Sequence, residues 1–481
     1  MNSTYDSTVP GYTPASQLRR MIEAKELSPV ELMEATLRRI EAVDGDLGGY
    51  ITVMADEAMD AAQEAEAAVS RGDDLGPLHG IPVPIKDLEG VKGVRFTHGS
   101  VPDDEVADSD ALCVQRFREA GAIIVGKTNT PEYGHAGTTE NRVFGPARNP
   151  WNPERTPGGS SGGAAVSVAA GMTSIAQGSD GGGSVRIPAG FSGIYAIKTS
   201  QGRIPRRWSS EHSWHPVNNS SVGPMTWTVR DAALMMNVLA GPSPDAEATT
   251  LSGDPPDFTS GLERGIKGLR VAVSVDQGGA AVDPEVVSAV RSVAAAFEEL
   301  GAQVEERDFC PDDSNEALMN RFFDFFCIRG YAAHRDLLED GAKAEQLTDY
   351  FRQDLEHAQA KTAADYVATL NAIGRYRAYA DAFFHDYDLL LCPTTAVPAF
   401  PIEQPPSSIA GRQIDRVRWG FIPFTPVFNL TGNPAASVPC GFSTDGLPIG
   451  CQIVGRLEDE LTVLAASAAF EEARPWDRRP A

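Results

Sequence analysis

The stretch PGGSSGGAAVSVAAGMTSIAQGSDGGGSVRIP, residues 157–188, is the segment around which the rest of the chain can be interpreted. It holds two glycine-flanked serine clusters, at 158–163 and 181–184, joined by small residues without a charge until Asp180. Glycines let the backbone approach other backbone or a ligand closely. A serine with free N–H donors beside it has what a nucleophile and its oxyanion hole require. We therefore expect the functional site in this stretch.

The pattern of the whole chain predicts an α/β fold, because helical and strand-like segments alternate along it. Residues 269–307 are expected to form a β-α-β unit and residues 313–385 a wholly helical, aromatic-rich region. Other helices are expected over about 14–25, 29–43, 55–70, 109–120, 229–240 and 459–473, and other strands over 80–87, 122–126, 388–393 and 449–455.

We treat residues 1–481 as one domain, since no clean boundary or internal repeat is present. Within it, 76–240 is the expected catalytic core and 259–385 the β-α-β unit with a helical region on the substrate side. Residues 201–224 are basic, contain tryptophan and lack periodicity, so we expect a surface loop there. Such a loop is either a lid over the site or an exposed disordered segment.

Composition excludes several classes of partner. The net charge of −25, from 41 basic and 66 acidic side chains, argues against nucleic acid and anionic membranes. The six cysteines are scattered without a C-x-x-C pair, which indicates neither a zinc site nor a disulfide framework. Neither a signal peptide nor an apolar run long enough to span a bilayer is apparent. We expect a cytoplasmic protein without a metal or cofactor, and leave open a homodimer.

Two common motifs match without their usual context. GAIIVGKT (121–128) matches a phosphate-binding loop, but its apolar, β-branched interior predicts a buried strand instead. The serine cluster at 158–162 matches G-x-S-x-G, yet three prolines stand where a strand should lead into a nucleophile elbow. A Ser-His-Asp α/β-hydrolase, with one of the late histidines as base, is the weaker alternative; these are His334, His357 and His385.

The remaining chemistry combines serine with lysine. A lysine acts as a base near neutral pH only if burial or a nearby positive charge lowers its pKa from about 10.4. Lys86, in IPVPIKDL, has the least polar sequence environment of any lysine in the chain. A structural role, paired with Asp87 or extended to the surface, is the alternative for this residue.

Several blocks, taken together, resemble the amidase signature family. They are GIPVPIKD, GKTNTPEYG, RNPWNPERTPGGSSGGAA, GSDGGGSVRIPAGFSG, LCPTTAVPAFP and FNLTGNPAASVPCGF, and they occur in the family's order. The resemblance is strong over 76–240, loose over 242–385 and clear again over 388–473. It implies a large twisted mixed β-sheet flanked by α-helices on both faces.

The resemblance also assigns site residues. It places the family's catalytic lysine at Lys86, its bridging serine, in a cis peptide, at Ser160, and its nucleophile at Ser184. It places the oxyanion donors on the backbone of Gly181, Gly182, Gly183 and Ser184. Four further residues match supporting positions, with the last two expected to form a buried pair: Ser161, Ser179, Asp180 and Arg186.

We therefore expect a hydrolase that cleaves C–N bonds of linear amides through a serine acyl-enzyme. Its expected substrate is a small apolar or aryl amide or anilide, with carbamates and esters as further candidates. Tyr133, Trp208 and Trp214 are the candidate substrate contacts, and aromatic residues of 322–326 line either a funnel or the core. The alternative is a glutamine-hydrolysing amidotransferase component, against which the acidic charge and the lack of a basic patch speak.

Overall fold

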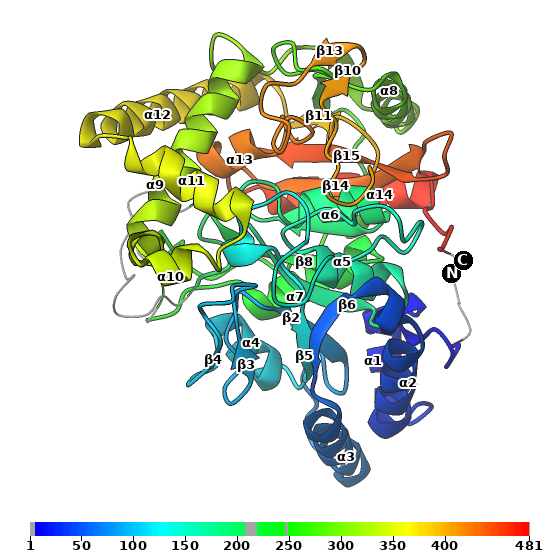
Figure 1. The fold of residues 1–481 in the computed structure, drawn as a ribbon. Coiled ribbons are helices and arrows are strands. Elements are labelled where there is room, and N and C mark those ends of the chain that lie inside the picture. The colour runs from blue at the N-terminus through cyan, green and yellow to red at the C-terminus, as the bar shows by residue number, and fades with distance from the viewer. Residues whose placement is uncertain (1–4, 207–218, 245, 247–248, 481) are drawn as a thin grey trace.

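A mixed sheet runs through the middle of the computed structural model, which describes residues 5–206, 219–244, 246 and 249–480 (Figure 1). Its strands, in spatial order, are β10, β9, β11, β15, β14, β7, β8 and β6. A smaller sheet has the order β1, β5, β2. The strands of these two sheets are β1 (Tyr50–Val53), β2 (Pro82–Lys86), β5 (Ile123–Thr128), β6 (Ile175–Asp180), β7 (Tyr195–Lys198), β8 (Ser221–Thr226), β9 (Arg270–Val273), β10 (Gln303–Glu306), β11 (Leu389–Pro393), β14 (Ala435–Phe442) and β15 (Pro448–Gly455).

Helices surround both sheets. They are α1 (Ala15–Glu23), α2 (Pro29–Leu47), α3 (Ala55–Arg71), α4 (Leu112–Glu119), α5 (Gly162–Ala169), α6 (Arg186–Ser192), α7 (Val229–Leu239), α8 (Pro284–Glu299), α9 (Asn315–Glu339), α10 (Gly341–Ala344), α11 (Asp349–Gln359), α12 (Ala363–Asp386), α13 (Pro426–Thr431) and α14 (Glu460–Ala473). Short two-stranded ribbons pair β3 (Arg95–Phe96) with β4 (Glu105–Val106) and β12 (Ser408–Ile409) with β13 (Arg412–Gln413). Among the helices of the described residues, none is both long and apolar enough to cross a membrane.

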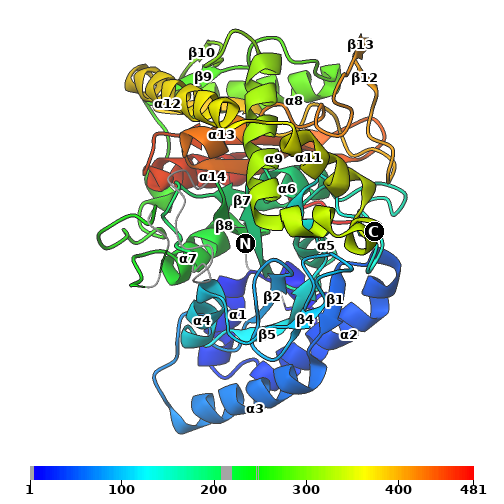
Figure 2. The same cartoon turned by 60° about the vertical axis from the view of Figure 1, so that its left-hand side comes forward.

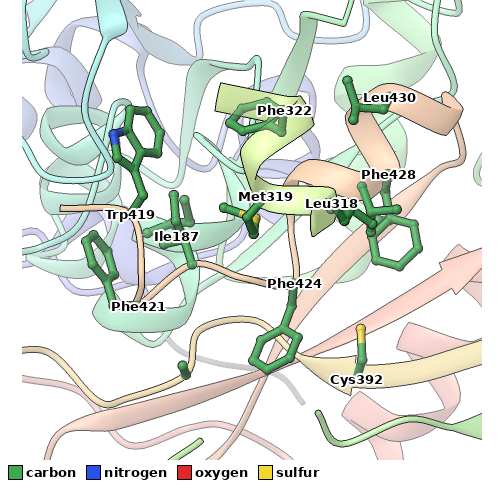
Figure 3. Close-up of a cluster of buried hydrophobic side chains, with 14 of the residues drawn as sticks. Ile187, Leu318, Met319, Phe322, Cys392, Trp419, Phe421, Phe424, Phe428 and Leu430 are labelled. Carbon is green, nitrogen blue, oxygen red and sulfur yellow. The ribbon is translucent and has the colours of Figure 1, made fainter. Parts of the chain in front are cut away.

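Both faces of the large sheet are covered, as the residues of β11 demonstrate. Leu389 and Leu391 pack into one cluster with residues of α7, α8 and α14. Leu390 and Cys392 point the other way and pack with residues of α6, α9, α12 and α13. Figure 3 shows part of this second cluster, where Ile187, Phe322 and Cys392 come from three different elements.

The serine stretch lies between the two ends of the molecule. Figures 1 and 2 place α3 and the small sheet at one end and α8 and α12 at the other, with α5, β6 and α6 between them. The first serine cluster leads into α5, and the second joins the end of β6 to the start of α6. Close packing explains the small residues: a Cβ on Gly163 would lie 2.4 Å from Gly49 O.

Most predicted elements are present. The β-α-β unit is β9, α8 and β10, with parallel strands, and 313–385 is almost entirely helical through α9 to α12. GAIIVGKT contributes β5, a buried strand, as predicted. The surface loop predicted over 201–224 is wrong at its end, because Ser221–Thr226 form the fully buried strand β8 between β7 and β6.

Candidate active site

Lys86 ends strand β2 and its side chain is completely buried. Its N–H donates to Gln177 Oε1 at 2.9 Å, which ties β2 to β6 of the large sheet. Its Nζ lies 2.7 Å from Ser160 Oγ, 2.9 Å from Ser161 Oγ and 3.4 Å from Ser179 O. The short strand thus delivers one amine into the interior beside the first serine cluster.

The partners of Ser161 determine how the protons around Nζ are arranged. Ser161 Oγ donates to Ser179 O at 3.1 Å and accepts from Ser179 N at 3.2 Å. The hydroxyl has only one proton, so its contact with Lys86 must be one in which Nζ donates. A neutral amine has two N–H bonds and one lone pair. With its N–H groups directed at Ser161 Oγ and Ser179 O, the lone pair is left for the hydroxyl proton of Ser160.

The surroundings favour the neutral amine. Burial, together with the positive charge of Arg206, lowers the pKa of Lys86 from 10.5 to about 7. The carboxylates of Asp180 and Glu89 act in the opposite direction. Arg206 is held in place by Glu89, whose Oε1 accepts from Arg206 Nη2 at 2.6 Å. Near neutral pH, Lys86 therefore has both the position and the protonation state of a base.

Burial alone does not distinguish Lys86 from other lysines, contrary to what its sequence environment indicated. Lys127 and Lys198 are as fully buried. Lys127 donates to Asp87 Oδ1 at 2.6 Å, so Asp87 neutralises Lys127 and not Lys86. Lys198 Nζ donates to the carbonyl of Thr199 at 2.8 Å. The contacts with the serine clusters, above all with Ser160, single out Lys86 among these three amines.

The two candidate serines are close in the fold but differ in exposure. The Gly159–Ser160 peptide is cis and Ser160 is almost fully buried. Ser184 is 9% exposed, and its carbonyl accepts from Ser161 N at 3.1 Å. Within the described part of the chain, Ser184 Oγ makes no hydrogen bond, and neither Ser160 nor Ser184 bonds to a histidine. The weaker Ser-His-Asp alternative therefore has no support from this geometry.

Hydrogen bonds to four successive carbonyls orient the loop before Ser184. The donors are Asn429 Nδ2 to Asp180 O (2.9 Å), Asn219 Nδ2 to Gly181 O (2.6 Å), Thr425 Oγ1 to Gly182 O (2.7 Å) and Ile187 N to Gly183 O (2.7 Å). In a trans peptide the N–H points opposite to the carbonyl. Fixing these carbonyls therefore fixes the direction of the next four N–H groups, from Gly181 to Ser184.

One of these four donors is already engaged. Gly183 N donates to Asp180 Oδ1 at 2.7 Å. Among the described residues, the N–H groups of Gly181, Gly182 and Ser184 donate to no protein atom. Of the predicted oxyanion donors, these three are available in this structure and Gly183 is not. An arrangement of oriented, unused N–H groups can stabilise a developing negative charge.

The expected buried pair of Asp180 and Arg186 is present. Both side chains are fully buried, and two hydrogen bonds of 2.9 Å join the guanidinium to the carboxylate. This charge holds the pKa of Asp180 well below its ordinary value despite burial. Arg186 also donates to Thr425 O, Gln452 Oε1 and Asn429 Oδ1. The pair anchors the loop, because the same carboxylate accepts from Gly183 N and from Val185 N at 3.2 Å.

Aromatic residues of α9 border this loop. A Cβ on Gly182 would lie 2.5 Å from the ring of Phe322, and one on Gly181 would lie 3.7 Å from the ring of Phe326. Trp419 packs edge-on against both rings, at centroid distances of 6.1 and 5.7 Å, and Figure 3 shows Trp419 and Phe322. Phe322, like Phe323 and Phe325, is a core residue, whereas Phe326 is only partly buried. Phe322 and Phe326, which border the loop, and Trp419, which packs on both, are called the aromatic wall below.

The remaining predicted contacts lie elsewhere. Tyr133 precedes Gly134, where an added Cβ would lie 3.3 Å from Ser160 Oγ, but the ring of Tyr133 packs against His98, His334 and Phe351. Trp208 and Trp214 lie outside the described residues.

A cavity of about 470 Å³ is lined by residues of the 135–142 loop, of the start of α11 and of 403–421. Within the described chain, no group of three or more His, Cys, Asp or Glu side chains is arranged to hold a metal ion.

Comparison with known proteins identifies the family. The family model described as amidase matches residues 31–464. The chain belongs to the amidase family. An acylamidase of Rhodococcus erythropolis is 36% identical over 477 residues, which is 97% of each chain. A component of the glutamyl-tRNA(Gln) amidotransferase of Moorella thermoacetica is 35% identical over 489 residues, covering 97% of this chain and 98% of that one.

The fold class of this amidase family member is confirmed by solved structures. A bacterial aryl acylamidase of the amidase signature enzymes superposes with a TM-score of 0.91 at 32% identity, covering 97% of each chain. The large mixed sheet with helices on both faces is therefore the amidase signature fold, as the resemblance implied.

Sequence reasoning missed four residues that hold the glycine loop. Asn219, Thr425, Asn429 and Gln452 reach it or its anchor through side-chain hydrogen bonds. They lie 38 to 266 positions in the chain from the residues that they contact. The block FNLTGNPAASVPCGF contains Asn429 and marked it as part of the family pattern, but the block does not indicate which residue Asn429 contacts.

Proposed function

We propose that this amidase family member hydrolyses small amides through an acyl-enzyme on Ser184. The observation that carries the proposal is the 2.7 Å contact between Lys86 Nζ and Ser160 Oγ in a fully buried site. The lone pair of neutral Lys86 takes the Ser160 proton, and Ser160 takes that of Ser184. Among the described residues no hydrogen bond joins Ser160 to Ser184, and the proposal requires one to form for the proton to pass between them.

The attack forms a bond from Ser184 Oγ to the amide carbon and places a negative charge on the carbonyl oxygen. The N–H groups of Gly181, Gly182 and Ser184 are the donors for this oxyanion, and one such donor is typically worth about 3–4 kcal/mol. The proton returns through Ser160 to the leaving amine as the C–N bond breaks. Water then hydrolyses the ester on Ser184 by the same relay.

Aryl and apolar amides or anilides are the proposed substrates. The aromatic wall beside Gly181 and Gly182 supports this, as do the names of the acylamidase and aryl acylamidase relatives. Carbamates and esters belong in the test panel because their carbonyl carbon is open to the same attack. We further propose that the enzyme acts in the cytoplasm, which its six free cysteines support, because free thiols persist in a reducing compartment. A homodimer remains part of the proposal.

A glutamine-hydrolysing component of an amidotransferase is the second candidate function. The 35% identity to components of glutamyl-tRNA(Gln) amidotransferases favours it. The purified protein, assayed alone with 4-nitroacetanilide, a phenyl carbamate, a phenyl ester and glutamine, separates the two. Hydrolysis of the anilide supports the first proposal. Activity on glutamine alone, or activity only with a partner protein, would overturn it in favour of the second.

A further inference from the structure

The side chain of Asn219 is held at both ends next to the glycine loop. Asn219 is buried, at 4% exposure, and its Nδ2 donates to Gly181 O at 2.6 Å. Its Oδ1 accepts from Arg329 Nη1, a residue of α9. Its backbone carbonyl accepts from Asn429 Nδ2 at 2.9 Å, and the same amide donates to Asp180. Asn219 therefore cannot move without disturbing the anchor of the loop.

The contact with Arg329 fixes the orientation of the Asn219 side-chain amide. A guanidinium has donors only, so the atom of Asn219 that contacts it must be the oxygen. The amide nitrogen is then directed to the opposite side, where Gly181 O lies. In a peptide with its carbonyl fixed in this way, the N–H of Gly182 points to the other side of the loop. That N–H donates to no protein atom among the described residues.

The same helix supplies both phenylalanines of the aromatic wall. Phe322 and Phe326 are on α9, and Arg329 follows Phe326 by three positions, about one helical turn. Figure 2 shows α9 close to α6, the helix that begins just after Ser184. A single rigid element therefore contacts the glycine loop through its rings and, through Asn219, holds the carbonyl of Gly181.

We propose that Arg329 and Asn219 are positioning residues that orient the Gly182 N–H toward the oxyanion. The inference rests on the proposed function, since it needs Ser184 to attack a carbonyl beside this loop. In this role both residues act through the Gly181–Gly182 peptide and not through the substrate. Their effect appears in the transition state, where the oxyanion forms, and hardly in the ground state.

Steady-state kinetics of four variants with 4-nitroacetanilide tests this. Asn219→Asp and Arg329→Met are expected to lower kcat about 10- to 100-fold, less than the 10²–10³ typical of deleting a donor outright. KM should change less than about threefold, because ground-state binding is retained. Arg329→Lys keeps a charged donor and should recover most of the activity. Arg321→Met, an exposed arginine on the same helix, is the matched control and should behave as wild type.

A trifluoromethyl ketone that adds to Ser184 provides the second readout, because its adduct carries an oxyanion. Its inhibition constant should rise in proportion to the fall in kcat/KM across the variants. Losses confined to KM, inhibition that does not follow kcat/KM, or no kinetic change in Asn219→Asp and Arg329→Met would overturn the inference. If wild type itself hydrolyses no amide, the proposed function fails instead. Melting temperatures of all variants separate a loss of folding from a loss of orientation.

Discussion

Lowering the pH from 8 to 6 should protonate Lys86 and stop proton transfer to it. Burial, assisted by Arg206, sets the pKa of this amine at about 7 in place of 10.5. The neutral fraction is then about 91% at pH 8 and about 9% at pH 6, so kcat/KM should fall about tenfold. A lysine with its ordinary pKa would be only about 0.1% neutral at pH 7.5. The predicted acid limb is therefore a direct readout of this burial.

The assay is kcat/KM for an anilide between pH 5.5 and 9 at constant ionic strength. Because kcat/KM reports groups of the free enzyme, its acid limb should follow one proton with an apparent pKa near 7. The rate rises with pH, since the depressed pKa belongs to a base that works in its neutral form.

Two substitutions at Arg206 sharpen the test. Arg206→Met removes a positive charge that lowers the pKa of Lys86, so the limb should move to higher pH. Arg206→Lys keeps the charge and should leave the limb near its original position. Arg38→Met removes an exposed charge, 62% exposed in its side chain, and is the control. A kcat/KM that does not change between pH 6 and 8, or an acid limb whose apparent pKa is the same in Arg206→Met as in wild type, would refute this account of the base.

Three further outcomes follow from the same contacts. Lys86→Ala should abolish turnover, while Ser160→Ala should leave slow hydrolysis; both are measured as kcat with melting curves to establish folding. Arg186→Met should lower the free energy of unfolding by about 3–5 kcal/mol in urea titrations, since it leaves the buried carboxylate of Asp180 unpaired. An unchanged unfolding midpoint would count against the anchor. Gly182→Ala should lose about 1–3 kcal/mol of stability as well as activity, because its Cβ would lie 2.5 Å from Phe322; Phe322→Leu in the same chain should restore part of both.

The sequence was most informative where chemistry is local. The glycine-flanked serines, the apolar strand ending at Lys86 and the spacing of Asp180 and Arg186 all lie within short segments. Strong helical and apolar patterns likewise predicted α8 and β11 close to their observed bounds, and predicted a helical region over 313–385, which α9 to α12 largely occupy without their separate bounds having been predicted. Local patterning succeeds here because each element buries one face or a continuous apolar run.

The misses are residues whose roles depend on distant partners. Ser221–Thr226 has serine, glycine and proline and no apolar alternation, yet it is a buried strand because β7 and β6 flank it. Lys127 and Lys198 are as buried as Lys86, and only their three-dimensional partners separate their roles. Asn219 contacts Gly181 and Arg329 across 38 and 110 positions, which no window of sequence reveals.

Mass spectrometry of the covalent intermediate tests the central claim most directly. Wild type is mixed with a 4-nitrophenyl ester or an activated anilide, quenched in acid within the burst phase, and digested. The account predicts one acyl group on the peptide that carries Ser184, and none in Ser184→Ala. An acyl group on Ser160, or an adduct and turnover that persist in Ser184→Ala, would contradict it.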